Sequence, residues 1–164
     1  MSGTGQDDAR VLALARAGVE RAAPEELPLF GPTSEAFLED PASLGRQRGG
    51  DQVLGFGVET ALVLVTPAAL SVARDVVTFV ANQVRARLAS EGEGAVQRTL
   101  DRIFGGDKAP ADTATPAEPP PPELSDEQLE RVHALALEKA RLLRLSDAKA
   151  EMLADSIVGS LATG

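Results

Sequence analysis

The stretch LGFGVETALVLVTPAALSVARDVVTFVANQVRARL, residues 54–88, is the most apolar part of the chain and decides its fold. Thr66 and Pro67 divide it. Threonine is a good helix N-cap, and proline is favoured at the first helical position but disfavours helical geometry in the residue before it. We therefore expect a helix to begin at Pro67. The apolar positions that follow share one face, which predicts an amphipathic helix of roughly six turns: Leu70, Ala73, Val76, Val77, Val80, Val84 and Leu88.

The piece before this helix, residues 54–66, is apolar nearly all round. Periodicity does not separate a short buried helix from a buried strand here, and we favour a helix because the chain offers no second convincing strand to pair with it. Glu59 is the one charged residue of the piece. Its carboxylate lies either at the exposed end of the helix or in the interior, paired with Arg74.

Residues 53–73 are long enough to cross a bilayer. Pro67 and the adjacent Arg74 and Asp75 oppose a membrane span. We therefore expect this segment to be buried in protein, and a hairpin that enters the membrane interface is the alternative.

Two further helices are expected in the first two thirds of the chain. The sequence DDARVLALARAGVERAA, residues 7–23, predicts a helix that Pro24 ends. Residues 24–51 look like a loop, with one or two helical turns between Ser34 and Asp40. The sequence AVQRTLDRIF, residues 95–104, predicts a helix that stops at two glycines and places Val96, Leu100, Ile103 and Phe104 on one side.

A proline-rich segment, residues 106–123, separates this part of the chain from the last 41 residues. Its composition predicts a disordered linker, because it holds too little apolar surface to offset the entropy lost on ordering. The run Pro119–Pro122 favours stiff polyproline II. We interpret it as a spacer, and a docking site for a proline-binding domain is the alternative.

A helical hairpin follows the linker. Ser125 is a good N-cap, and Gln128 completes a capping box with it. Ser146 is the expected N-cap of the second helix. The apolar stripe of the first helix is Leu129, Val132, Ala136, Ala140 and Leu143, and Leu135 and Leu142 widen it. The stripe of the second helix is Met152, Leu153, Ile157, Val158 and Leu161. Two short helices rarely bury enough surface to be stable alone, so the hairpin needs the rest of the chain or another molecule.

These patterns predict an all-α protein with a small helical unit and a C-terminal helical hairpin. We divide it into an N-terminal helix and loop-rich segment (1–50), a central apolar helical unit (51–105), the linker (106–123) and the hairpin (124–164). The chain has no Trp and no Tyr and only five Phe, so the core must be aliphatic.

Composition excludes several classes of function. The chain has no cysteine, which removes disulfides, thiolate catalysis and Cys-ligated zinc. The net charge of −9 opposes nonspecific binding to nucleic acid and to anionic membranes. The N-terminal sequence is acidic where a signal peptide is basic, so we expect a cytoplasmic protein. The abundance of Ala, Leu, Val and Arg fits a bacterial genome of high GC content.

Little catalytic chemistry is visible. His133 follows Glu130 by three residues, the Glu-x-x-His step of carboxylate-bridged di-iron helices. Such a site needs two of these steps, so only a symmetric dimer with Glu138 or Glu151 contributing would complete one; a solvated helix face is the preferred interpretation. No serine lies in a nucleophile elbow, and no phosphate-binding glycine loop is present. We predict no enzymatic activity, no metal and no cofactor.

The C-terminal sequence IVGSLATG, residues 157–164, is similar to the Gly-Ser-Leu targeting peptides that dock cargo inside encapsulin shells. The resemblance implies that the tail docks the protein in a shell. Those peptides usually follow a flexible linker, whereas here the proline-rich segment comes before the hairpin and Gly159, Ser160 and Leu161 complete a helix.

We therefore expect a non-catalytic adaptor or assembly subunit that uses amphipathic helices to bind its own copies or a larger protein, and not nucleic acid. Insertion of residues 54–80 into a membrane and shell targeting by the tail are the alternatives. The residues expected to bind the partner are Leu70, Val76, Val77, Val80, Val84, Leu129, Val132, Leu153, Ile157 and Leu161.

Overall fold

The computed structural model describes residues 3–42, 64–105 and 124–162, and every secondary-structure element in these ranges is helical. The all-α prediction is therefore confirmed. Glu59, most of the 54–66 piece and the linker at 106–123 lie outside the described residues. The elements in chain order are α1 (Gly3–Ala22), the 3-10 turn η1 (Pro24–Glu26), α2 (Leu27–Glu39), α4 (Val65–Arg87), α5 (Glu93–Gly105), α6 (Asp126–Leu142) and α7 (Asp147–Ala162).

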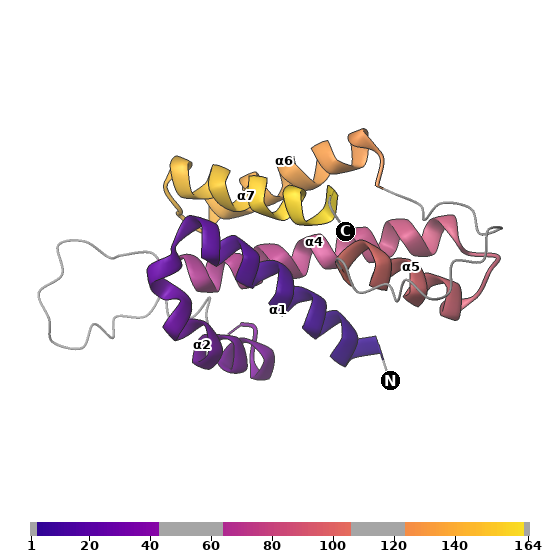
Figure 1. The fold of residues 1–164 in the computed structure, drawn as a ribbon, viewed down its shortest axis with the longest axis horizontal. Helices are drawn as coiled ribbons and strands as arrows, with labels where there is room; N and C mark the ends of the chain where they lie inside the picture. Colours follow the sequence, from indigo (N-terminus) through magenta and orange to yellow (C-terminus); the bar gives the residue numbers. More distant parts are fainter. Residues whose placement is uncertain (1–2, 43–63, 106–123, 163–164) are drawn as a thin grey trace, which may run out of the picture.

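Four long helices form a bundle (Figure 1). Helix α1 packs on α4 and α7, and α6 packs on the same two helices, so the four close into a ring. Helices α1 and α6 run in one direction and α4 and α7 in the other, which makes ring neighbours antiparallel. At one end α2 packs beside α1 and α4, and at the other end α5 packs mainly against α4.

Helix α4 is the most enclosed element of the bundle. Twelve of its 23 residues are buried, because it contacts the other helices on several sides. The expected face from Leu70 to Val84 is buried, and Ala68, Ala69 and Val72 extend the buried surface beyond it. The buried side chains of the described residues are mostly Ala, Val, Leu and Ile, with Phe37 the one fully buried aromatic ring among them. This confirms the aliphatic core.

The start of α4 differs from the prediction. The helix begins at Val65, and Thr66 is its second residue instead of its N-cap. Glu26 of η1 supplies the cap from another part of the chain: its Oε1 accepts a hydrogen bond from Val65 N at 2.9 Å, and its Oε2 accepts from Thr66 N and Thr66 Oγ1, both at 2.8 Å. A carboxylate also stabilises the positive end of the helix dipole. With those N–H groups satisfied, the helix can start two residues before Pro67.

The prediction of a loop over residues 24–51 is wrong for the first half of that range. Helix α2 extends over Leu27–Glu39 with Pro32 inside it. Proline inside a helix removes one hydrogen bond and crowds the carbonyl four residues earlier, at a cost of about 3 kcal/mol. Tertiary packing offsets this cost, since Phe37 of α2 is buried in the core and the Arg74 guanidinium lies 5.9 Å from the centre of its ring.

The other predicted helices are confirmed, with α1 beginning four residues earlier than expected. Ser125 and Gln128 form the expected capping box at the start of α6. Ser146 Oγ accepts a hydrogen bond from Lys149 N at 3.4 Å at the start of α7. Between them Arg144 has a left-handed backbone with φ 64°, and Leu145 N donates to Ala140 O at 3.1 Å, which closes the end of α6.

A buried arginine joins α1 to α5. The guanidinium of Arg10 donates to Asp7 on its own helix and to Asp101 on α5, each at 2.6 Å, and to Gln97 Oε1 at 3.1 Å. Arg10 is buried, whereas Asp101 is more than half exposed. The three acceptors satisfy a charge that burial alone would disfavour, and they place α5 on the end of the bundle.

Candidate functional site

The residues expected to bind a partner lie in the interior of the single chain. Nine of the ten are buried, and Leu129 is partly buried against the same core. The hairpin stripe packs on α1 and α4, and α1 also covers α4. A partner would reach these side chains only after the bundle opened. The buried nine are Leu70, Val76, Val77, Val80, Val84, Val132, Leu153, Ile157 and Leu161.

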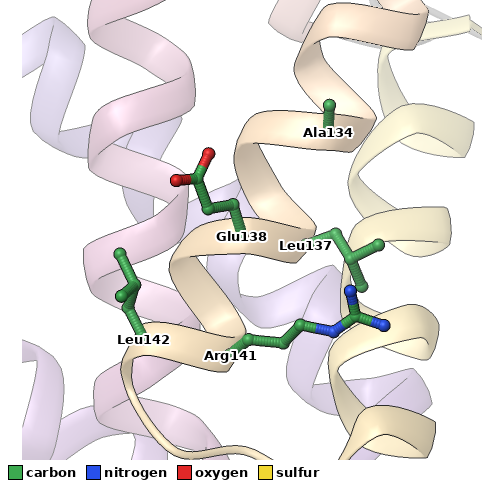
Figure 2. Close-up of a pocket in the computed structure, with 5 residues that line it drawn as sticks. All are labelled: Ala134, Leu137, Glu138, Arg141 and Leu142. Carbon is green, nitrogen blue, oxygen red and sulfur yellow. The ribbon is translucent and has the colours of Figure 1, made fainter.

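The outer face of α6 carries a different set of side chains. Ala134, Leu137, Glu138, Arg141 and Leu142 line a shallow hollow of about 420 Å³, and we call these five residues the α6 strip (Figure 2). Their spacing of three and four residues places them along one side of the helix. Leu142 is 71 % exposed, the largest exposed fraction among the described large apolar residues.

The two flanks of the α6 strip face different neighbours. Figure 2 shows Leu142 and Glu138 on the side of α4 and Leu137 on the side of α7. On the α4 side Lys139 Nζ lies 2.9 Å from Asp75 Oδ2. On the α7 side His133 Nε2 lies 3.0 Å from Asp155 Oδ1, and Arg141 Nε donates to Asp147 Oδ1 at 3.0 Å. These contacts hold α6 in place from both sides.

The two contacts between α6 and α7 also set the register of the hairpin. Arg141 follows His133 by eight residues, and Asp147 precedes Asp155 by eight residues. Leu137, midway between the first two, is therefore level with Glu151 on α7, which lies midway between Asp147 and Asp155. Met152 was expected in the apolar stripe of α7, but its side chain is 48 % exposed and lies outside the core.

The Glu-x-x-His step does not meet other ligands in this fold. His133 pairs with Asp155. Within residues 3–42, 64–105 and 124–162, no group of three or more His, Asp or Glu side chains is placed to hold a metal ion. Glu138 lies in the α6 strip and Glu151 is exposed on α7.

The C-terminal Gly-Ser-Leu sequence is part of α7. Leu161 is only 6 % exposed and belongs to the core, and Ser160 Oγ donates to Ser156 O at 2.9 Å. A shell that bound this sequence as a free peptide would first have to remove Leu161 from the bundle. Gly159, unlike Leu161, lies on the exposed side of the helix.

Only part of the segment considered for membrane insertion, residues 54–80, lies within the described residues. Residues 65–80 lie within α4 and contribute much of the core. Among the helices that the structure describes, none combines the length and the apolar character needed to cross a bilayer.

Other exposed leucines do not form a comparable strip. Leu29 and Leu38 lie nine residues apart on α2, which places them on opposite sides of that helix. Leu64 is exposed just before α4. Leu142 was expected to widen the core-facing stripe of α6, and that prediction is wrong, because its side chain is 71 % exposed. Leu137 carried no such expectation; it lines the α6 strip and is partly buried against the core.

No protein-family model matches this chain, and no significant match is found among curated proteins or solved structures.

Proposed function

We propose that this protein is a non-catalytic adaptor or assembly subunit of the cytoplasm that binds another protein through the α6 strip. The observation that carries the proposal is the position of Leu142. It is the most exposed large apolar side chain of the described residues, and it lies beside a hollow lined by further α6 side chains. Exposed apolar surface with a polar rim is typical of interaction sites.

The chemistry of the strip suits an amphipathic helix of a partner. Ala134 is small and allows close approach of another backbone, while Leu137 and Leu142 offer apolar contact on the two flanks. Glu138 and Arg141 supply an acceptor and a donor on the same surface. Grooves of this kind recognise helices whose apolar residues recur at three- and four-residue spacing.

The structure changes which residues the proposal depends on. The expected contact residues are used to hold the chain together, because the helical stripes face each other across the ring of four helices. Binding through the α6 strip leaves that core intact. A partner is therefore recognised by the folded bundle, without the cost of opening it.

The test compares proteins that co-purify with the full chain and with two variants. In Leu142→Asp the strip loses its exposed leucine and gains a charge, so a specific partner should be lost. Leu29→Asp is the matched control, since Leu29 is 52 % exposed on α2 at a different face. Circular dichroism establishes that both variants are folded. A partner set that is identical for the wild type and Leu142→Asp would show that the strip is not the binding surface.

A further inference from the structure

The outer face of helix α2 carries few charges for a surface helix. Eight of its 13 residues are exposed, and only two of these eight are charged, Glu35 and Glu39. Charged and polar side chains normally cover the solvent side of such a helix. Leu29, Pro32 and Ala36 are exposed and follow one another at spacings of three and four residues, which places them on one side of α2. We call these three residues the α2 outer stripe.

The side of α2 that packs in the core carries other residues. Phe37 is buried, and Leu27 and Phe30 are partly buried against the core. Leu29 remains 52 % exposed although α2 packs on α1 and α4. The α2 outer stripe is therefore apolar surface that none of the described helices covers.

The two ends of α2 lie next to the two ends of the segment 43–63, which is outside the described residues. Ala42, the last described residue before this segment, comes three residues after the C-terminal end of α2. After the segment, Val65 N donates to Glu26 Oε1 at 2.9 Å, so the start of α4 lies beside the first turn of α2. The connection therefore has to return over the length of α2, which is about 20 Å for 13 residues.

The last part of this connection has the composition of a partner for the stripe. Residues 53–63 have the sequence VLGFGVETALV, with seven apolar side chains and one charge. We propose that residues 53–63 bind the α2 outer stripe of their own chain and run antiparallel to α2. Eleven residues in helical form extend over about 17 Å, close to the length of α2, and residues 43–52 remain to reverse the chain direction. Attachment at both ends of the surface favours this segment over a partner that binds from solution.

The charges of the segment agree with this direction. Arg46 and Arg48 are the first two charged residues after Asp40. An antiparallel segment places them near the C-terminal end of α2, where Glu35, Glu39 and the helix dipole are negative. The same acidic side chains would repel an anionic bilayer. Charge complementarity therefore favours the chain's own segment over a lipid surface.

The experiment uses tryptophan as a probe, because the full chain contains none. Leu54→Trp, Phe56→Trp and Val58→Trp are made as separate variants, so that the result does not depend on one position. When the segment binds α2, the emission of at least one probe should lie at shorter wavelength than that of a free tryptophan amide, with protection from acrylamide. Adding Leu29→Asp or Ala36→Asp places a charge in the α2 outer stripe, and both effects should then be lost.

Two exposed leucines outside the stripe provide controls. Leu38→Asp makes the same kind of change on the opposite side of α2, and Leu142→Asp makes it on α6. Neither substitution should alter the emission or the quenching of the probe. Circular dichroism and thermal melting of every variant separate release of the segment from loss of folding. Release by Leu142→Asp instead would mean that the segment covers the α6 strip, and equal release by Leu38→Asp would mean that the α2 outer stripe is not the site.

Three further results overturn the inference. Probes that are all fully quenched in the chain with an unaltered α2 show that the segment does not bind. A shift to shorter wavelength that appears only as protein concentration rises, together with a dimer in sedimentation, assigns the stripe to a second copy. A shift that appears only with phosphatidylcholine vesicles assigns the segment to lipid. None of these results bears on the α6 strip, whose partner is tested separately.

Discussion

Glu26 offers the sharpest test of how this fold is held together. The residue is only 7 % exposed, and its carboxylate accepts three hydrogen bonds at the start of α4. Replacement by alanine removes a helix cap, with a typical cost of about 1 kcal/mol, and the charge at the helix N-terminus, with a cost of up to about 1 kcal/mol. It also leaves the hydroxyl of Thr66 without its acceptor, for about 1 kcal/mol. We expect Glu26→Ala to lower the free energy of unfolding by about 3 kcal/mol.

Two milder variants divide this effect. Glu26→Gln keeps one oxygen but turns an amide N–H₂ toward at least one backbone donor, so it should cost about 1–2 kcal/mol. Thr66→Val removes the hydroxyl and keeps the backbone N–H contact with Glu26, so it should cost about 1 kcal/mol. Urea denaturation followed by circular dichroism measures all three, and a loss of 3 kcal/mol corresponds to a midpoint shift of roughly 10 °C on heating.

Glu25→Ala is the matched control for this series. Glu25 is the preceding residue, its side chain is 68 % exposed, and its contact with Lys149 is 4.0 Å long. Exposed ion pairs contribute little, so the control should remain within about 0.5 kcal/mol of the wild type. If Glu26→Ala is as stable as Glu25→Ala, the carboxylate does not cap α4 and the account of its early start is wrong.

Five other substitutions test the packing of the bundle by urea denaturation. A methyl group at Gly18 of α1 would overlap the fully buried side chain of Leu153 on α7, whereas one at Gly159 would meet no atom within 4 Å. Gly18→Ala should therefore cost about 1 kcal/mol and Gly159→Ala should gain up to about 1 kcal/mol, and gains at both positions would contradict the close approach of α1 and α7. Arg144→Gly should stabilise the chain by about 0.5–1 kcal/mol, because glycine adopts φ 64° without steric cost; a loss would mean that the arginine side chain matters more than its backbone. Leu153→Ala should cost about 2–5 kcal/mol while Leu142→Asp stays within about 0.5 kcal/mol, and a large loss for Leu142→Asp would place that residue in the core.

Local signals were sufficient where a helix depends on its own residues. Ser125 and Gln128 form a capping box within three residues, so α6 could be located before any tertiary contact was known. Most positions of the core-facing stripes of α5, α6 and α7 were predicted by the same kind of argument, because apolar residues at three- and four-residue spacing turn toward whatever covers them. Leu142 and Met152, expected on these stripes, are exposed instead. What covers them is not a local property. The stripes were assigned to a partner, and the structure places them against α1, α4 and one another.

The candidate site was hidden from the sequence for a related reason. An apolar residue on a helix is read as core until the position of every neighbouring helix is known. Leu137 and Leu142 are distinguished from Ala136 and Ala140 only by the side of α6 on which α4 and α7 lie. The packing of the four helices in a ring is what identifies the outer face of α6 as exposed.

The sequence by itself determined that this chain is helical, that its interior is aliphatic, and where α5, α6 and α7 begin or end, because propensity, capping and periodicity act within a few residues. The tertiary structure alone decided that α2 is a helix despite Pro32 and that α4 starts at Val65. In both cases the decisive group comes from elsewhere in the fold: the packing of Phe37 in the core and the carboxylate of Glu26. It also decided which apolar faces stay exposed, since burial depends on neighbours brought together from distant parts of the chain.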